Sequence, residues 1–557
     1  MRLFFLLFTF SLLLSCNTKE KVDLLVYNGT IYTVDSSFSR KEAMAIKEGK
    51  IVETGTTAEL QKKYSATESV DAQGKFIYPG FIDAHAHFVG YGLGLQTVNL
   101  VGTASWEEII DKLKAFAATN PDGWLIGRGW DQNDWTVKEF PDNKLLNELF
   151  PDRPVLLTRI DGHAAVANKK ALELSGVKPG QKITGGDIMT YTPIGKTDID
   201  SKEFPIDLLT GVLIDNAVDL VSAKIPAPTE EQFKKALQAA EKNCFAVGLT
   251  TIDDCGLDYQ QALAIYALQQ KKELKMRLYI MLSDTRANID YLHSDRLTKT
   301  DRINIRGLKV YADGALGSRG ACLLEPYHDK PNWSGFLLSS LNHFDSVAQV
   351  LRKRDLQMCT HAIGDSGNRA ILNIYAKYLK GKNDLRWRIE HAQVVNQNDF
   401  NLFGANSIIP SVQPTHATSD MYWAADRLGA ERVKGAYAYK QLLQQNGWLP
   451  LGTDFPVEDI STFKTFYAAV VRKDAKGWPE AGYQMENALT REEALRGMTI
   501  WAAKSNFEEK EKGSLEKGKY ADFVILDKDL LKVADTDILS TTVLKTFLNG
   551  EKVYEKK

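Results

Sequence analysis

Two histidines stand two residues apart in one short apolar segment. Residues 79–89 read PGFIDAHAHFV, with Asp83, His85 and His87 at every second position. Because side chains alternate along a strand, we expect His85 and His87 to point to the same side. Two neutral imidazoles at that spacing supply half of a zinc ligand set. The alternative is a pair of core histidines with satisfied hydrogen bonds, so the rest of the chain has to supply the missing ligands.

Other residues that could bind metal lie in apolar segments elsewhere in the chain. Lys309 is in GLKVYADG, His361 in THAIGD, His391 in RIEHAQ and Asp454 in LGTDFP. Simpler explanations are a core histidine at 361, a hydrogen bond from His391 to Glu390, and a helix N-cap at Asp454. Lys309 is harder to explain, because a buried ammonium group needs a carboxylate partner or a chemical change that masks its charge. The clustering of these residue types indicates one shared site.

These residues can meet only if their segments are neighbouring strands. The middle of the chain alternates short apolar segments with helical stretches, which is typical of an α/β fold with a parallel sheet. In a (β/α)8 TIM-type barrel, functional groups collect at the carboxyl ends of the strands, where all these residues would stand. The eight predicted strands are GFIDAHAHF, GLTTIDDCG, MRLYIMLS, RGLKVYADG, LQMCTHAIG, RWRIEHAQ, SIIPSVQPT and WLPLGTDFPV.

Two parts of the chain lie outside the barrel repeat. A large segment at about 95–235 follows the first barrel strand, and we interpret it as an insertion over the barrel mouth. Both ends of the chain contain short strand-like segments with turn signals. Residues 23–78 and 508–557 therefore predict one composite β-sandwich, with the barrel over 79–507.

Residues 1–16 read MRLFFLLFTFSLLLSC, one early arginine and then an apolar run. Such a run predicts a secretory signal peptide and is too short for a stable transmembrane helix. Its LLSC end resembles a bacterial lipobox, which implies cleavage before Cys16 and lipid attachment to its thiol; a plain signal peptide is the alternative. With residues 17–22 as a tether, we expect an exported protein, lipid-anchored to a bacterial membrane on its periplasmic or cell-surface side.

Composition excludes some partners. The formal net charge of the 557 residues is −2, so we expect no nucleic-acid partner. None of the five cysteines forms a C-x-x-C pair, which argues against a cysteine metal site or a disulfide framework. We expect buried free thiols, although a bridge is allowed in an oxidising compartment. The sequence leaves a homodimer open.

Nine motifs together resemble the amidohydrolase superfamily, which are metal-dependent hydrolases with a (β/α)8 barrel and a flanking β-sandwich. The specific similarity is to amidohydrolase family 3, the branch that includes N-substituted formamide deformylases. One mild departure is Ala315, where serine is common. The motifs are PGFIDAHAHF, GRGWDQNDW, DGHAAVAN, GLKVYADGALGSR, THAIGD, RIEHAQ, QPTHATSDM, LGTDFPV and GSLEKGKYADFVILD.

The resemblance implies a centre of two divalent metal ions. In the family pattern, His85 and His87 bind one ion, while His361 and His391 bind the second. Lys309, carboxylated on its amine by CO2, would bridge them as a carbamate, which also explains a buried lysine. We expect Zn²⁺ from imidazole and carboxylate ligands, with Fe²⁺, Mn²⁺ and Co²⁺ as alternatives.

The resemblance gives Asp454 two roles, as a ligand of the first ion and as the catalytic group that takes a proton from the attacking water. Metal-activated hydroxide would then cleave the C–N bond of an amide. A version with one ion stays open, in which Lys309 remains an amine and His391 orients the substrate. That ion would be held by His85, His87, His361 and Asp454.

Weaker candidates surround this set. His416 in QPTH could be catalytic by donating a hydrogen bond to the developing oxyanion. Asp313 could anchor a ligand or a substrate amine. Trp130 and His163, in the insertion, could line the substrate pocket, with ordinary packing as the alternative. Arg319 could bind a substrate carboxylate or form a surface salt bridge.

The leading hypothesis is a hydrolase acting on a carbon–nitrogen bond other than a peptide bond. Its small-molecule substrate would be an N-substituted formamide, an N-acyl amide or a cyclic amide. A deaminase or isomerase on the same scaffold is the second hypothesis. A non-catalytic, lipid-anchored binding protein is a third, and the intact set of ligands argues against it.

Overall fold

The computed structural model describes residues 19–191, 205–294 and 298–557. The signal peptide predicted over 1–16 and the lipidation of Cys16 lie outside the described residues. Strand β1 (Glu20–Tyr27) begins inside the segment predicted as a tether, because Val22 is buried and the strand pairs with β6. None of the helices in the described part of the chain combines the length and apolar character needed to cross a membrane.

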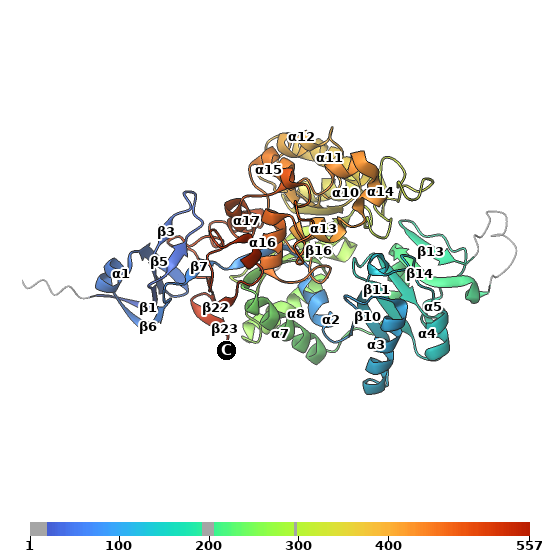
Figure 1. Ribbon diagram of the computed structural model, residues 1–557, viewed down its shortest axis with the longest axis horizontal. Helices are drawn as coiled ribbons and strands as arrows, with labels where there is room; N and C mark the ends of the chain where they lie inside the picture. Colours follow the sequence, from blue (N-terminus) through green and yellow to red (C-terminus); the bar gives the residue numbers. More distant parts are fainter. Residues whose placement is uncertain (1–18, 192–204, 295–297) are drawn as a thin grey trace, which may run out of the picture.

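Seven parallel strands form a nearly closed barrel at the centre of the molecule (Figure 1). Helices α7 (Glu230–Ala246), α10 (Leu341–Arg352) and α11 (Asp365–Leu379) pack on the barrel strands next to them. In sheet order the strands are β20 (Ile409–Ser411), β19 (Arg388–His391), β18 (Gln357–Ala362), β17 (Ile303–Tyr311), β16 (Arg277–Ser283), β15 (Leu249–Leu257) and β8 (Phe81–Ala86).

The segment predicted as the eighth strand closes the barrel without forming a regular strand. Gly452 N–H donates to the carbonyl of Val412, just after β20, at 3.0 Å, and Asp454 N–H donates to His85 of β8 at 2.7 Å. Pro450 has no N–H to donate, and Asp454 has a φ of +64°, which breaks the extended conformation. The segment therefore bridges β20 and β8 through a few backbone hydrogen bonds.

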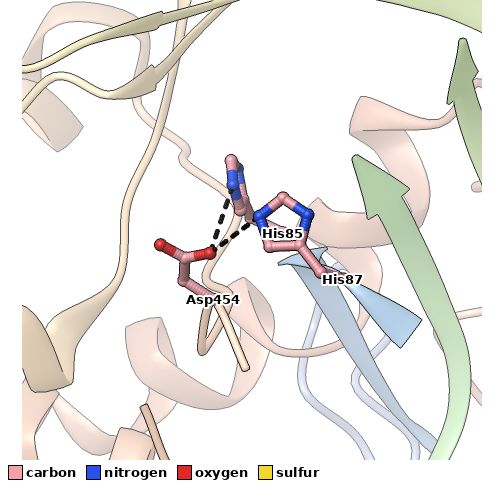
Figure 2. Close-up of side chains that lie close together, drawn as sticks. All are labelled: His85, His87 and Asp454. Carbon is pink, nitrogen blue, oxygen red and sulfur yellow. Dashed lines mark ion pairs between the residues drawn. The ribbon is translucent and has the colours of Figure 1, made fainter. Parts of the chain in front are cut away.

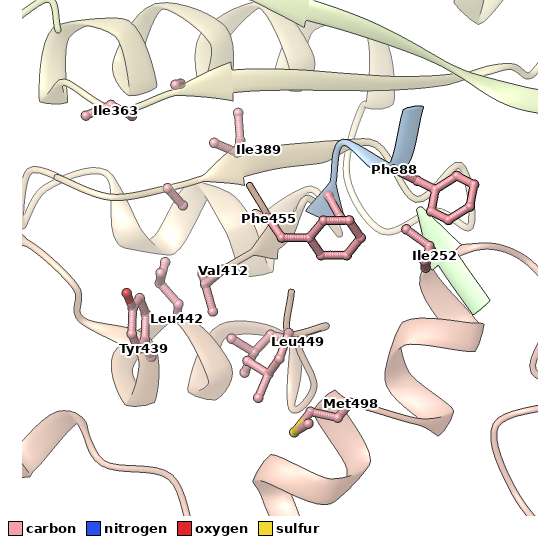
Figure 3. Close-up of a cluster of buried hydrophobic side chains, with 14 of the residues drawn as sticks. Phe88, Ile252, Ile363, Ile389, Val412, Tyr439, Leu442, Leu449, Phe455 and Met498 are labelled. Carbon is pink, nitrogen blue, oxygen red and sulfur yellow. The ribbon is translucent and has the colours of Figure 1, made fainter. Parts of the chain in front are cut away.

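One large hydrophobic cluster joins the barrel strands to their surrounding helices. Figure 3 shows part of it, with Ile389 of β19 and Ile252 of β15 near Phe455, and with Tyr439 and Leu442 of α15 (Tyr439–Asn446) beside Val412. Apolar side chains of the strands thus face outward to the helices. The burial of this surface holds the strands in place and so fixes the positions of the residues at their carboxyl ends.

The predicted insertion forms its own layer beside the barrel mouth (Figure 1). Its six-stranded sheet has the order β13 (Gly186–Thr190), β14 (Leu209–Asp215), β12 (Ala164–Ala167), β11 (Val155–Arg159), β10 (Leu125–Trp130) and β9 (Val98–Asn99). The helices of this layer are α3 (Trp106–Thr119), α4 (Lys144–Leu149), α5 (Lys169–Ser175) and α6 (Asn216–Ser222).

Two further sheets lie at the opposite side of the barrel. The first is four-stranded and comes from the N-terminal region, with the order β5 (Lys50–Gly55), β4 (Ala43–Lys47), β1 and β6 (Tyr64–Asp71). The second combines both ends of the chain, and buried side chains of the two sheets form one cluster. Its order is β23 (Glu551–Glu555), β22 (Val543–Leu548), β21 (Phe523–Leu526), β7 (Phe76–Pro79), β2 (Thr30–Tyr32) and β3 (Arg40–Lys41). The domain boundaries given above stay predictions.

Candidate metal centre at the barrel mouth

Asp454 lies opposite the two histidines of the first barrel strand. His85 is in β8, while His87 is the residue before α2 (Phe88–Gly94). Oδ1 of Asp454 is 3.2 Å from Nε2 of His87 and 3.6 Å from Nε2 of His85. Figure 2 shows both imidazoles facing this carboxylate. His85 is fully buried, whereas the side chain of His87 is 28% exposed, so the open side of the group is at His87.

The histidines of β18 and β19 complete a ring of imidazoles. The ring centre of His391 is 4.6 Å from that of His361 and 4.6 Å from that of His85. Nδ1 of His391 is 4.0 Å from Oδ2 of Asp454. The structure therefore brings together residues from four separate segments of the chain.

Lys309 lies in the same group and is fully buried. Its Nζ is 3.3 Å from Nε2 of His85 and 4.8 Å from the ring centre of Tyr311. No carboxylate of the described residues lies within 4.0 Å of this amine. All six residues predicted as ligands thus meet at the barrel mouth, and Lys309 is the buried amine that the sequence left unexplained.

His416 is also part of the group, on α13 (Pro414–Asp420). Its Nε2 is 3.6 Å from Oδ2 of Asp454, and its ring is 14° from parallel to that of His391 at 5.8 Å. Two sets of three residues have ligand atoms close enough for one cation each. These sets are His85, His87 and Asp454, and His391, His416 and Asp454. His361 belongs to neither set, although the family pattern gave it to the second ion.

Electrostatics keep three of the histidines and Asp454 in the protonation states that a metal requires. Burial lowers the pKa of His361 and of His391 well below the usual 6.5, and burial with the nearby Lys309 lowers the pKa of His85 to about 4. Burial raises the pKa of Asp454, but the neighbouring His85 and His87 more than offset it, leaving this pKa well below 3.8. Neutral imidazoles around an ionised carboxylate are the donor set that divalent cations bind.

Two buried polar atoms of the group have no hydrogen-bonding partner among the described residues. They are Oδ1 of Asp454 and Nε2 of His416. Buried polar atoms are seldom left unpaired, because each loses its hydration without compensation. Both atoms point to a ligand that the protein does not itself contain, and a cation fits the acceptor atoms on both.

The backbone is strained at two of these residues. His391 has a φ of +73° and Asp454 a φ of +64°, values that residues other than glycine seldom adopt. Such conformations cost on the order of 1–3 kcal/mol each and persist where surrounding contacts impose them. Each residue stands at the end of a segment that forms the barrel wall. The strained backbone there accompanies a side chain that is directed into the barrel mouth.

Glu390 and Gln413 orient two of the imidazoles. Oε2 of Glu390 is 2.6 Å from Nδ1 of His85, and Oε1 of Gln413 is 2.8 Å from Nδ1 of His391. The sequence suggested that Glu390 would bind its neighbour His391, and the structure gives a different partner. The alternation of side chains along β19 could have indicated this partner, because Glu390 lies on the same interior face of the strand as Arg388, two residues earlier. Polar partners of this kind fix the orientation of metal-binding histidines.

The insertion contributes His163 to the mouth. Its ring centre is 4.9 Å from that of His361, and its Nδ1 is 2.6 Å from Oδ1 of Asp215. Asp215 was not among the predicted residues and has a φ of +50° at the end of β14. The position of His163 agrees with a residue that lines the substrate pocket.

The other predicted binding residues differ in their surroundings. Trp130 is fully buried in the core of the insertion, where its indole N–H donates to Leu157, which favours the packing interpretation. Arg319 pairs with Asp329 at 2.8 Å, which favours the salt bridge. Asp313 is buried and accepts three backbone N–H groups, so its role is to hold loops beside His361. Those N–H groups belong to Cys322, Ile363 and Gly364.

A polar pocket of about 510 Å³ opens beside α13. Thr415 and Ser419 of that helix line it together with Glu458, and the insertion adds Asn133 and Asp134. Glu458 accepts a hydrogen bond from Ser419 at 2.6 Å. The pocket borders the helix that carries His416, but none of the residues of the metal centre lines it.

Comparisons with known proteins agree with this geometry. A model of the amidohydrolase family, family 3, matches residues 68–554. The putative amidohydrolase YtcJ of Bacillus subtilis is 30% identical, over 95% of this chain and 99% of its own length. The N-substituted formamide deformylase of Arthrobacter pascens is 24% identical, over 96% of this chain and 98% of its own. The protein LONG AFTER FAR-RED 3 of Arabidopsis thaliana is 34% identical, over 96% and 91% respectively.

A solved structure has the same architecture. An uncharacterised metal-dependent hydrolase from Pyrococcus horikoshii aligns with a TM-score of 0.73 and 28% identity. The alignment covers 92% of this chain and 99% of the archaeal one. The similarity therefore extends over the barrel, the insertion and the terminal sheets together.

Proposed function

Because this chain belongs to amidohydrolase family 3, we propose that it hydrolyses a non-peptide C–N bond in a small amide. The observation that carries the proposal is Asp454, whose carboxylate faces His85 and His87 with one oxygen and His391 and His416 with the other. The candidate substrates are N-substituted formamides, N-acyl amides and cyclic amides. The deformylase among the relatives supports the first class.

The residues that would hold divalent cations are those of the barrel mouth. One ion would be bound by His85, His87 and Asp454, and a second by His391 with His361 or His416. We propose Zn²⁺, because imidazole and carboxylate ligands suit it. A divalent cation supplies Lewis-acid chemistry there, since it lowers the pKa of water and polarises a carbonyl oxygen.

The chain's own groups handle the protons. Asp454 is ionised and accepts a proton from the attacking water at one carboxylate oxygen. The same carboxyl group then passes that proton to the departing nitrogen, which leaves as an amine. With His361 as the ligand of the second ion, Nε2 of His416 stays free to carry a proton, and it donates a hydrogen bond to the carbonyl oxygen as negative charge develops there. Glu390 keeps the ring of His85 in its orientation.

Lys309 is proposed to carry a carbamate formed with CO2. Its buried amine, 3.3 Å from Nε2 of His85 and without a nearby carboxylate in the described chain, supports this modification. Protein prepared without CO2 should regain activity when bicarbonate and metal are added together. The Lys309→Arg variant should not respond, since a guanidinium group does not form the carbamate under these conditions.

Metal content and hydrolysis together test the proposed function. Purified protein should contain about two equivalents of divalent metal and should hydrolyse at least one compound from a panel of formyl, acyl and cyclic amides. His85→Ala should lose both metal and hydrolysis. His343→Ala is the matched control, because His343 is exposed and paired with Asp284 away from the mouth. Full activity in His85→Ala would refute the assignment of the site.

We also propose that residues 1–16 direct export and that Cys16 carries a lipid anchor. The apolar run and the LLSC motif of the sequence support this. Cells that express the protein should incorporate labelled palmitate into the wild type and not into Cys16→Ser. Incorporation into the variant would refute lipidation at this cysteine.

A further inference from the structure

Arg128 of the insertion lies on a β-bulge. The pairing of β10 with β11 shifts register between Arg128 and Trp130. The intervening Gly129 has a φ of +114°, and a Cβ there would be 2.5 Å from Cγ2 of Val101, so only glycine fits. A bulge re-aims the side chain beside it, and such bulges are frequent next to active sites.

The bulge directs Arg128 to the barrel mouth. A Cβ on Gly162 would be 3.2 Å from Nη2 of Arg128, so the guanidinium group lies against this glycine. The next residue is His163, whose ring is 4.9 Å from the ring of His361 in the metal centre. Arg128 therefore stands at the edge of the site, on the side formed by the insertion.

The charge of Arg128 is unpaired in the described structure. Its Nη2 donates to the carbonyl of Ile160 at 3.1 Å, and its Nε is buried without a hydrogen-bonding partner. Among the described residues, none supplies a carboxylate within 4.0 Å of it. A partly buried guanidinium without an anion is costly, because it has lost part of its hydration and nothing replaces it.

Arg159, on the neighbouring strand, is the matched contrast. Its guanidinium group binds Asp131, Asp161 and the side-chain oxygen of Gln132. The insertion thus pairs the fully buried Arg159 with carboxylates and leaves the partly buried Arg128 without an anion. Arg319, which the sequence suggested as a partner for a substrate carboxylate, is already bound to Asp329.

We propose that Arg128 binds a carboxylate on the substrate, so that the natural substrates are amides that also carry a carboxylate group. This inference rests on the proposed function and deepens it. The planar fork of arginine matches a carboxylate with two parallel hydrogen bonds. Its position beside the metal centre sets the carboxylate on the insertion side while the amide reaches Asp454.

Paired ligands test the preference for a carboxylate. The metal-loaded protein is given N-acetyl derivatives of alanine, leucine and phenylalanine, in both enantiomers, and the matching N-acetyl amino acid amides. Compounds that are turned over are compared by kcat/KM, and the others by the Kd from calorimetry. At least one acid should be preferred over its amide by about 30-fold or more, as expected for a desolvated charge pair.

Variants of Arg128 and Arg319 test which arginine causes the preference for the acid. Arg128→Met should abolish the discrimination between acid and amide, chiefly by raising the KM or Kd of the acid to that of the amide. Arg128→Lys should retain part of it, since the charge remains and the fork is lost. Arg319→Met should keep the full preference. An Arg128→Met variant that loses acid and amide equally, or a wild type with no preference, overturns the inference.

Thermal unfolding separates binding from a structural role. Arg128→Met should unfold at the same temperature as the wild type or higher, because a partly buried charge without an anion has been removed. A clear drop in its unfolding temperature would show that Arg128 serves the fold, and would overturn the inference. Hydrolysis of neutral amides without a preference for acids would refute only the role of Arg128. A preference that depends on Arg128, without hydrolysis of any compound, would refute only the proposed function.

Discussion

Two polar groups in the barrel interior differ in how their charges are paired, although each contains a buried atom without a hydrogen bond, which in the first group is Nε of Arg388. A lower layer consists of Asp253, Arg388 and Asn506. Nη1 of Arg388 is 2.9 Å from Oδ2 of Asp253, and Nδ2 of Asn506 donates to Oδ1 of the same carboxylate at 2.6 Å. The metal centre above it leaves Oδ1 of Asp454 and Nε2 of His416 without hydrogen-bonding partners in the described chain.

The difference shows what each layer is for. Charges that the protein neutralises by itself hold the strands of the barrel together, and removing one partner leaves the other buried and uncompensated. Charges and lone pairs that the protein leaves open need a ligand from outside. Glu390 connects the layers, since it binds His85 above and lies 3.9 Å from Arg388 below.

Among these substitutions, Asp454→Asn should have the largest effect, and this effect should be on activity rather than on stability. The amide cannot accept the proton of the attacking water and is a poorer ligand, so hydrolysis should fall at least about 10³-fold. Thermal unfolding of the metal-free protein should change far less than activity does, because asparagine keeps the shape of the side chain and the backbone hydrogen bond to His85. Assays of kcat/KM and melting curves on the same samples would measure both, and a marked loss of stability would break the contrast.

Arg388→Met should show the opposite pattern. The substitution leaves Asp253 buried without its cationic partner, so the free energy of unfolding should drop by about 3–5 kcal/mol. Denaturant unfolding of wild type and variant would measure the loss. The folded fraction should still bind metal. A stable Arg388→Met protein would mean that the lower layer is not what holds the strands.

Glu390→Gln should act on both layers more weakly. The glutamine can still accept a hydrogen bond from His85, but it lacks the charge that supports the ring, so metal affinity should fall about 10–100-fold. Competition with a chelator would measure this. Gln413→Glu, beside His391, tests the reverse change at the matching position, and should not weaken metal binding.

Asp254→Asn should produce the smallest effect, visible only through pH. Burial raises the pKa of Asp254 to about 7, although it accepts the N–H of Val89. Between about pH 4 and 7, the folded protein therefore keeps a proton on Asp254 that the unfolded chain has released. The stability that this proton gives the wild type is lost as the pH rises through 7. The gain in melting temperature from asparagine should be larger at pH 8 than at pH 5. An equal gain at both would contradict the raised pKa.

Much of the barrel could be predicted from local pattern. Seven of the eight segments chosen as strands are strands in the structure, because apolar runs between helices are a property of short stretches of sequence. The eighth differs since Pro450 and the left-handed Asp454 limit it to a bridge. The spacing of the site residues along these segments could likewise be read directly, and all six predicted ligands meet.

The sequence alone determined which segments carry the chemistry: His85, His87, Lys309, His361, His391 and Asp454, and also the family. Only the tertiary structure decided which atoms face one another. The closed barrel places Asp454 between two pairs of imidazoles, and it makes His85, instead of the adjacent His391, the hydrogen-bonding partner of Glu390. Folding the insertion back over the mouth aimed Arg128 at the site and hid Trp130. The physical reason is that alternation and hydrophobicity act over a few residues, whereas contacts between distant segments depend on how the strands and turns pack.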